Sequence, residues 1–190
     1  MFVFIKRSID IIFAISLLPL ILILLGIFFV LIKFTSKGPF IFWSDRIGKN
    51  SLIFSMPKIR TMHINTPQKA THLLKNPEDC LVKFGSFLRK TSLDEMPQIF
   101  LILKGKMSIV GPRPALFNQL DLISLRKSKG IDILKPGLTG WAQVNGRDNI
   151  SINEKVNLDE YYFQNKSILL DMKIILLSIY VVFKRKSISH

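Results

Sequence analysis

Hydrophobic positions are concentrated near the start of the chain. From Ile11 to Ile32 the sequence reads IIFAISLLPLILILLGIFFVLI, an uncharged run interrupted only by one serine, one proline and one glycine. As a helix, a run of this length crosses about 30 Å of hydrocarbon, the core of a bilayer. It is longer than the apolar part of a cleaved signal peptide, and no small-residue cleavage site follows it. We therefore expect residues 1–36 to form a membrane anchor.

Basic residues flank this apolar run on both sides. Lys6 and Arg7 precede it, and the cations that follow it are Lys33, Lys37, Arg46 and Lys49. Positive flanks favour the cytoplasmic side of a membrane, so both ends of the run prefer the same side. Pro19 removes one helical hydrogen bond in the middle of the run, which kinks a helix. The residues alone leave two interpretations open: a re-entrant helix that returns to its own side, and a kinked helix that spans the bilayer.

The pattern changes to short β-like stretches in residues 39–62. Two runs rich in aromatic and β-branched residues are separated there by Gly48, Lys49 and Asn50. Such runs around a turn-forming centre predict a β-hairpin. The polar residues 63–77 that follow show no period, and we expect a loop.

Helical periodicity returns after this loop in several short segments. Apolar stripes predict helices over residues 81–89, 93–105 and 116–130. Ser151 and Glu154 have the spacing of a capping box, which predicts the start of a further helix. The segments VGPRP and KPGLTGWAQVNGRDN are rich in proline and glycine and predict stiff turns and connections.

The last segment, residues 168–183, is strongly apolar but contains Asp171 and Lys173. Its uncharged part is too short to span a bilayer, so we expect an amphipathic helix at the membrane interface, with the basic residues Lys184, Arg185 and Lys186 toward the headgroups. The expected fold is α+β: a small, mostly helical catalytic domain over residues 37–190 with a short β-hairpin, attached to the anchor of residues 1–36.

Composition limits the partners of such a domain. The chain has 190 residues and 27 Lys and Arg against 13 Asp and Glu, a formal net charge of +14, while 48% of its residues are hydrophobic. This combination indicates a membrane surface and phosphate-bearing ligands together. Cys80 is the only cysteine, which excludes an intramolecular disulfide, and the three histidines show no metal-ligand spacing.

Two adjacent carboxylates, Asp94 and Glu95, are the most informative residues of the basic chain. Pro97 follows them, and proline is tolerated in a helix only in the first turn, so a helix begins at about Leu93 or Asp94. In one interpretation both acids only cap this helix, since Ser92 and Glu95 also have capping-box spacing.

The neighbouring cations suggest a second interpretation of this pair. Arg89 precedes the helix, and Arg113 follows it in the proline-stiffened VGPRP segment. A helix start together with guanidinium groups favours phosphate binding. A carboxylate at such a site either helps to hold a divalent metal against a diphosphate or attacks phosphorus directly. The dipole and the cations are expected to keep this carboxylate ionised.

Ordered blocks along nearly the whole chain resemble the bacterial sugar transferases known as monotopic phosphoglycosyl transferases. These blocks are KR at 6–7, DR at 45–46, KIRTM at 58–62, RKTSLDEMPQ at 89–98, LKGKMSIVGPRP at 103–114, KPGLTGWAQVNGR at 135–147 and LDEYY at 158–162. The length is similar to that of minimal members without extra N-terminal spans. The resemblance implies a re-entrant helix broken at Pro19, although this chain has Leu18 where the family often has serine.

The resemblance also implies an activity. The family transfers a sugar phosphate from a UDP-sugar to polyprenyl (undecaprenyl) phosphate, releases UMP, and thereby starts glycoconjugate synthesis on the cytoplasmic face of the bacterial inner membrane. It works with Mg²⁺ through a phosphorylated aspartate. On matching positions Asp94 is the nucleophile, and Glu95 assists in binding the metal or handling protons. Whether the chain forms a homodimer stays open.

Further residues are candidates for substrate binding. Phosphate contact is the first interpretation of Arg89 and Arg113, and a solvated surface charge is the other. For three more cations, Arg46, Lys58 and Arg60, both interpretations stay open. Thr139, Gln143 and Arg147 resemble the family's loop near the nucleotide and sugar. Trp141 is an interfacial anchor or a stacking platform, and Tyr161 and Tyr162 are expected in the core.

Other functional classes fit the sequence less well. A metal-dependent membrane phosphohydrolase would share the carboxylate pair and the cations, but it would make no sugar-lipid. The net charge alone would also suit a membrane-tethered binder of nucleic acid or anionic lipid. We expect no nucleic-acid partner, because the basic residues lack the aromatic pattern of a known nucleic-acid module. The segment ALFNQLDLISLRKSKG resembles members that use N-acetylated amino sugars.

Overall fold

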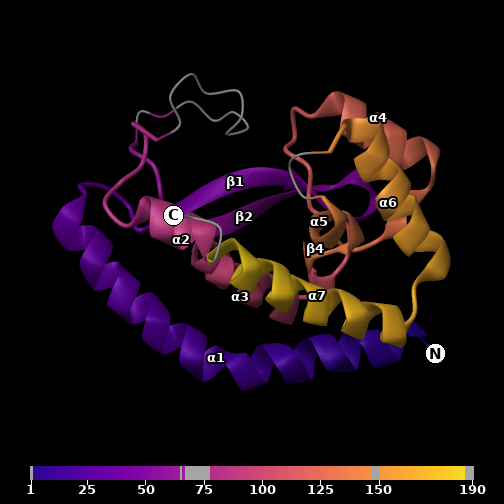
Figure 1. Ribbon diagram of the computed structural model, residues 1–190, viewed down its shortest axis with the longest axis horizontal. Helices are drawn as coiled ribbons and strands as arrows, with labels where there is room; N and C mark the ends of the chain where they lie inside the picture. The colour runs from indigo at the N-terminus through magenta and orange to yellow at the C-terminus, as the bar shows by residue number, and fades with distance from the viewer. Residues whose placement is uncertain (1, 65, 67–77, 147–149, 187–190) are drawn as a thin grey trace.

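A computed structural model describes residues 2–64, 66, 78–146 and 150–186, and within residues 183–186 the backbone alone. One long helix lies along the base of the molecule, and the hairpin and the shorter helices stand on it (Figure 1). In chain order the elements are α1 (Phe2–Thr35), β1 (Ile41–Ile47), η1 (Lys49–Ser51), β2 (Ile53–Ile59), α2 (Gly85–Lys90), η3 (Leu93–Gln98), α3 (Ile99–Leu103), β3 (Ser108–Val110), α4 (Leu120–Ser128), η4 (Ile131–Ile133), β4 (Gly137–Thr139), α5 (Trp141–Asn145), α6 (Ile152–Asn165) and α7 (Ile168–Lys186). The expected mixture of helices with a short hairpin is confirmed.

Both ends of α1 contact the same domain. Arg7 donates to two carbonyls at the end of α3, at 2.5 and 2.8 Å. Buried Asp10 accepts a hydrogen bond from the amide of Ile109 in β3 at 3.0 Å. Toward the other end, Phe28 and Ile32 are buried in a cluster with residues of β2 and α2. The helix therefore lies along the domain and is fixed to it at both ends.

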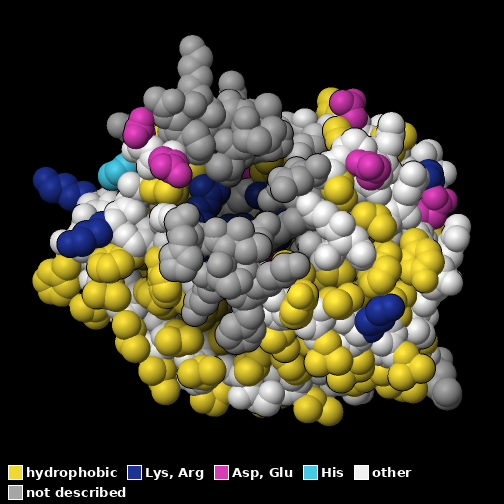
Figure 2. Space-filling model, in the orientation of Figure 1, with side chains coloured by type: hydrophobic (Ala, Val, Ile, Leu, Met, Phe, Trp, Pro, Cys, Tyr) yellow, Lys and Arg dark blue, Asp and Glu magenta, His cyan; other side chains and the backbone are white. Residues whose placement is uncertain are grey.

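The middle of α1 presents an apolar surface. By length and composition α1 is able to cross a membrane. It is one continuous helix through Pro19 and bends along the base of the molecule (Figure 1). Pro19 has no amide hydrogen to donate within the helix, which is a common cause of such a bend. Hydrophobic side chains gather over α1 and the lower part of this face (Figure 2).

The predicted hairpin is present. β1 and β2 pair antiparallel, with Ile41 opposite Ile59 and Ile47 opposite Ile53. The connection includes Asn50 at a φ of 57°, a left-handed conformation that asparagine tolerates better than most residues. β2 also packs on η3, so the hairpin supports the carboxylate pair from one side.

The helix predicted over residues 81–89 begins later than expected. It starts at Gly85, because Phe84 has a left-handed φ of 69° that interrupts the helix. Gly85 packs directly on the backbone of Thr61, where an added Cβ would lie 2.3 Å from the carbonyl oxygen. Leu81 pairs instead with Met62 as an isolated bridge. The apolar spacing was therefore correct for Leu88 in the core but wrong for the start of the helix.

The parallel pairing of β3 with β4 was not predicted. The three-residue strand β4 lies within the segment expected to be a connection, and β3 ends at Val110, the first residue of the VGPRP segment. Gly137 in β4 makes the pairing close, since a Cβ there would lie 2.1 Å from the amide nitrogen of Gly111. The pair brings the segment around Arg113 beside the segment around Thr139.

The C-terminal helices are largely as expected. Ser151 and Glu154 form the predicted capping box of α6. Tyr162 is buried, as predicted, and donates to Asp171 of α7 at 2.7 Å. The expectation for Tyr161 was wrong: the residue is 48% exposed, and its ring stacks on Trp141 at a centroid distance of 5.5 Å. Positions one apart on a helix face different directions, so only one of the tyrosines can point inward.

Candidate active site

The carboxylates of Asp94 and Glu95 lie inside the domain. The two residues are 6% and 7% exposed and lie in the first turn of η3. Ser92 precedes this turn with a left-handed φ of 59°, and in the described structure its side chain forms no N-cap hydrogen bond. Pro97 lies within η3, where the 3₁₀ turn tolerates it. The simple capping interpretation therefore fails for the Ser92 and Glu95 pair.

Glu95 is held by two cations from different elements. Lys58 of β2 donates from Nζ to Oε1 at 2.7 Å. Arg113 donates to both carboxylate oxygens, from Nη2 to Oε1 at 2.8 Å and from Nη1 to Oε2 at 3.4 Å. Burial alone would raise the pKa of Glu95, but the charges and hydrogen bonds of Arg113 and Lys58 outweigh burial and hold that pKa well below its usual range. Glu95 is therefore ionised at neutral pH.

Asp94 has a different environment from its neighbour. Its Oδ2 lies 3.9 Å from Lys58 Nζ, an ion pair at longer range. Burial raises the pKa of Asp94, and the adjacent charge of Glu95 adds to this, while the charges of Lys58, Arg89 and Arg113 oppose the rise. The pKa of Asp94 therefore lies above its usual range, because desolvation has the larger effect. The expectation that the dipole and the cations keep this carboxylate ionised stays a prediction.

Arg46 completes the cluster around the pair. It donates from Nε to Ser44 at 3.1 Å and from Nη1 to the carbonyl of Pro114 at 3.3 Å. Burial and the nearby charge of Arg113 lower the pKa of Arg46 to about 10, although the charge of Glu95 acts in the opposite direction. Arginine with this pKa is still a cation at pH 7.

The cluster as a whole carries excess positive charge. Four cations act on two carboxylates, and the cations are Arg46, Lys58, Arg89 and Arg113. Like charges brought together away from water repel, so the arrangement favours an added anion. Guanidinium groups suit phosphate oxygens in particular.

The structure places Arg60 in a different role from the other cations. Its guanidinium donates to the carbonyls of Lys37 and Ser36, at 2.7 and 3.1 Å. It is buried, and it ties the chain after α1 to the end of β2. These contacts fix the junction between the helix and the hairpin, so they give Arg60 a structural role and do not bring it to the carboxylate pair.

The predicted nucleotide loop, which carries Thr139, Gln143 and Arg147, begins in β4, and β4 pairs with β3. It therefore lies beside Pro112, Arg113 and Pro114, which we call the PRP segment. Thr139 of β4 exchanges a hydrogen bond with Ser178 of α7 at 2.6 Å. Gln143 of α5 donates to the carbonyl of Leu138 at 3.1 Å, and its buried Oε1 has no partner among the described residues. Arg147 lies outside the described residues.

Several buried charges were missed from the sequence. Asp171 accepts from Lys6 at 2.6 Å and so links α7 to the start of α1. Arg126 of α4 pairs with buried Asp159 of α6. Each of these pairs joins residues far apart in the chain, and local spacing gives no sign of such contacts. The one available signal was the charge inside apolar segments, as for Asp171.

The carboxylate pair is also the place where a divalent metal would fit. Among the described residues, no group of three or more His, Cys, Asp or Glu could enclose a metal ion. Mg²⁺ does not need such a cage, since it is often bound by one or two carboxylates together with substrate phosphates. Asp94 and Glu95 would supply those carboxylates.

Comparisons with known proteins show the family of this chain. A family model described as bacterial sugar transferase matches residues 1–185. The sugar transferase EpsL of Bacillus subtilis is 36% identical over 97% of this chain and 90% of its own length. The UDP-glucose:undecaprenyl-phosphate glucose-1-phosphate transferase of Escherichia coli is 36% identical over 96% of this chain.

The relatives differ in length and in the sugar that they are named for. The chain spans 41% of the Escherichia coli protein and 42% of an Aeromonas hydrophila N-acetylgalactosaminephosphotransferase that is 35% identical. An uncharacterized Haemophilus influenzae sugar transferase is likewise matched over 41% of its length. The similarity nevertheless covers nearly all of this chain, with the PRP segment and the carboxylate pair inside it. The chain belongs to the bacterial sugar transferase family.

Proposed function

We propose that this protein transfers a sugar 1-phosphate from a UDP-sugar to undecaprenyl phosphate and releases UMP. The observation that carries the proposal is the buried cluster around Asp94 and Glu95, in which the cations outnumber the carboxylates. A sugar nucleotide brings a diphosphate whose negative charge would balance this excess. The names of the relatives support undecaprenyl phosphate as the acceptor.

The environments of the two carboxylates support different roles for them. Both oxygens of Glu95 are engaged by Lys58 and Arg113, so Glu95 orients these cations. Asp94 meets Lys58 only at 3.9 Å, which leaves its carboxylate better able to attack. We therefore assign Asp94 as the nucleophile and Glu95 as the residue that organises the site.

The reaction divides into two displacements at phosphorus. In the first, an oxygen of ionised Asp94 bonds to the β-phosphorus of the donor, the bond from that phosphorus to the bridging oxygen breaks, and UMP leaves. In the second, a phosphate oxygen of the lipid attacks the same phosphorus, and the Asp94 carboxylate departs with its bonding electrons. Arg113 and Lys58 lie where they would offset the charge on the phosphoryl oxygens. Mg²⁺ held by Asp94, Glu95 and the donor phosphates would neutralise further charge.

The loop beside the PRP segment is proposed to receive the rest of the donor. β3 and β4 place Thr139 and Gln143 next to the segment that carries Arg113. The buried Oε1 of Gln143 lacks a partner in the described structure, and it would accept a hydrogen bond from the nucleotide. We extend this role to Arg147, and we expect an N-acetylated amino sugar to be among the accepted donors.

The anchor is proposed to be re-entrant and to hold the domain on the cytoplasmic face of the bacterial inner membrane. Lys6 and Arg7 contact α7 and α3, while Phe28 and Ile32 pack on β2 and α2. A helix that crossed the bilayer would carry its two ends to opposite sides and break one of these sets of contacts. The exposed apolar faces of α1 and α7 would enter the lipid, as monotopic helices do.

Cysteine labelling tests this placement. Cysteines introduced near residue 3 and near residue 36 should both react with a membrane-impermeant reagent only when it is supplied from the cytoplasmic side. Labelling of the first from the outside would mean that α1 spans the membrane. The unchanged protein, whose only cysteine is Cys80, gives the background labelling.

Product analysis tests the activity itself. Purified protein in detergent should release UMP from at least one member of a UDP-sugar panel, in the presence of Mg²⁺ and undecaprenyl phosphate, and should form the matching sugar diphosphate lipid. Hydrolysis of the donor without any sugar-lipid would indicate a membrane phosphohydrolase instead. Salt-sensitive retention of DNA that is indifferent to Asp94→Asn, without UMP release, would indicate a nucleic-acid binder.

A further inference from the structure

The segment that carries Arg113 is held by its carbonyl groups. Pro112 and Pro114 have no amide hydrogen, so the segment has few donors of its own. Its four successive carbonyls each accept from another part of the protein: Pro112 from the amide of Gly137 at 3.0 Å, Arg113 from Arg126 Nη1 at 2.8 Å, Pro114 from Arg46 Nη1 at 3.3 Å and Ala115 from the amide of Ile47 at 3.0 Å. The position of the segment therefore depends on these external donors.

The donor to the Arg113 carbonyl is itself fixed. Arg126 of α4 donates from Nε and Nη2 to Asp159 Oδ2 of α6, at 3.0 and 2.6 Å. Arg126 is 8% exposed and Asp159 is 1% exposed. One guanidinium thus joins α4, α6 and the segment that carries Arg113.

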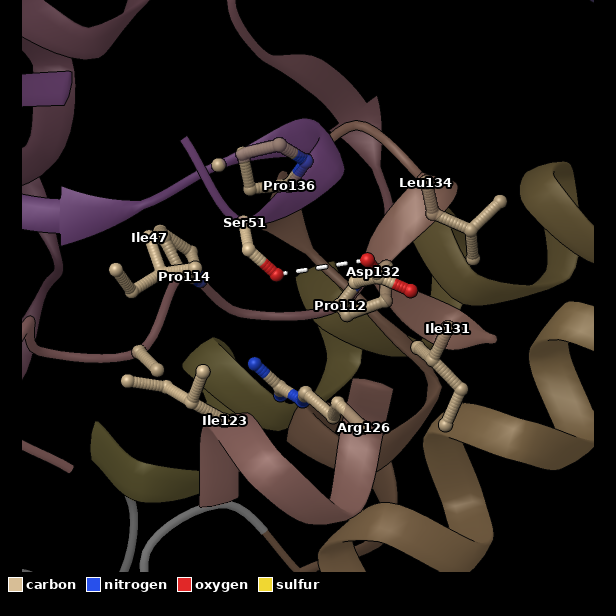
Figure 3. A pocket seen from close by; sticks show the side chains of 12 residues that line it. Ile47, Ser51, Pro112, Pro114, Ile123, Arg126, Ile131, Asp132, Leu134 and Pro136 are labelled. Carbon is tan, nitrogen blue, oxygen red and sulfur yellow. Dashed lines mark hydrogen bonds between the residues drawn. The ribbon is translucent and has the colours of Figure 1, made fainter. Parts of the chain in front are cut away.

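The space beside the segment on the side of Arg126 is not completely filled. A cavity of about 30 Å³ lies there, lined in part by Pro112, Pro114 and Ile131. Arg126 points into the space between these residues, as the close view shows (Figure 3). The Arg113 carbonyl beside this space accepts its hydrogen bond from Arg126.

We propose that Arg126 and Asp159 are positioning residues that place the Arg113 guanidinium on Glu95, acting through the Arg113 carbonyl without touching the substrate. This inference rests on the proposed function for its kinetic consequence. A shift of the reacting groups by about 1 Å is enough to lower a rate by about 10²-fold. The proposal gives a positioning role to two residues outside the carboxylate cluster.

A neighbouring ion pair offers a matched control. Lys129 follows α4 and pairs with Glu160 of α6 at 2.6 Å, so it links the same two helices. Both of its side chains are 31% exposed, and Lys129 also bonds Asn157 of α6. This pair connects the helices without reaching the carbonyl of Arg113.

The variants are chosen to separate positioning from folding. Arg126→Met combined with Asp159→Leu removes both charges, so no unpaired buried charge remains to unfold the protein. Arg126→Lys keeps a charge beside Asp159 but loses the fork that spans two partners. Lys129→Met combined with Glu160→Gln is the control. Two further variants are measured beside these. One is Arg113→Met alone, and the other combines Arg113→Met with Arg126→Met and Asp159→Leu.

Two measurements decide the proposal. Hydrogen exchange at the amides of Gly111 and Leu116, which are bonded to Thr139 and Gln119 and flank the segment, should quicken about tenfold or more in the Arg126 variants and not in the control. UMP release should fall about 10²-fold in the same variants, and Arg113→Met should add little to that loss because both changes act through one guanidinium. The control should stay within about twofold of the unchanged protein.

Each outcome has one meaning. Unchanged exchange at Gly111 and Leu116 would overturn the proposal whatever the activity. Losses that multiply fully when Arg113→Met is combined with the Arg126 and Asp159 changes would overturn it too. If the unchanged protein releases no UMP from any donor, the proposed function fails, and the exchange comparison still decides whether Arg126 and Asp159 fix the segment.

Discussion

Two buried ionic clusters of this protein differ in charge balance. Around Asp94 and Glu95 the cations outnumber the carboxylates, and the pKa values of the two acids move in opposite directions. Where α1 meets α7, Lys6 pairs with Asp171, and the Tyr162 hydroxyl satisfies the other oxygen of Asp171. The second cluster is complete as it stands, whereas the first still favours an anion. In this protein the cluster with excess positive charge is the proposed substrate site, and the balanced cluster joins α1 to α7.

The largest effect is expected from Asp94→Asn. The amide cannot form the acyl phosphate, so UMP release should fall by about 10⁴-fold or more. The fold should not suffer, because burial already disfavours the charge of Asp94, and the unfolding temperature should stay the same or rise. Kinetics and thermal unfolding of the same preparation check both parts. Release near the original rate would remove Asp94 from the reaction.

Glu95→Gln should also be severely impaired, for a different reason. It removes the acceptor that aligns Lys58 and Arg113, and we expect a loss of about 10²-fold to 10³-fold in UMP release. Unlike Asp94→Asn, this change should lower the unfolding temperature, since a favourably ionised group and its hydrogen bonds are lost. A fully active Glu95→Gln variant would mean that Glu95 has no part in organising the site.

The pH dependence of the first displacement should reveal the pKa of Asp94. The ionised form attacks, so the rate should fall as the pH drops through that pKa, which burial places above its usual range. The charge of Lys58 lowers this pKa, and Lys58→Met should therefore move the acid limb of the profile to higher pH. The exposed Lys90 supplies the control, and Lys90→Met should leave the limb in place. A limb that moves to lower pH in Lys58→Met would contradict the assignment.

Substitution in the balanced cluster around Asp171 should lower stability and change activity little. Asp171→Asn removes the ion pair with Lys6 and should lower the free energy of unfolding by on the order of 1–3 kcal/mol. Where the protein stays folded, UMP release should change less than about threefold, because the cluster does not depend on the substrate. Asp121→Asn, an exposed change on α4, is the matched control. If Asp171→Asn lowered the activity as much as Glu95→Gln does, the claim that the Asp171 cluster is only structural would be contradicted.

The sequence predicted the parts of the site that depend on neighbouring residues. The hairpin, the capping box of α6 and the helix start at Leu93 follow from local spacing. The pairing of β3 with β4 could not be predicted, because it joins two three-residue strands through a close backbone approach. The first turn at Asp94 is a 3₁₀ helix, and apolar periodicity does not distinguish that from an α-helix.

The sequence could not show which cations contact the carboxylate pair and which have a structural role. Lys58 and Arg60 lie two positions apart, yet Lys58 contacts Glu95 while Arg60 ties α1 to the hairpin. Their different roles depend on which residues from elsewhere in the chain meet each of them. The same holds for Arg126 and Asp159, whose contact joins helices separated by the whole nucleotide loop. The charge of Asp171 inside an apolar segment was visible in the sequence, but its partner Lys6 was not.

The covalent step is tested most directly by intact mass spectrometry of the protein mixed with a UDP-sugar and Mg²⁺ in the absence of undecaprenyl phosphate. The account predicts an added mass equal to one sugar phosphate, located on Asp94 by peptide mapping and discharged when the lipid acceptor is supplied. An active protein that carries no adduct under these conditions, or carries it on another residue, would contradict the account.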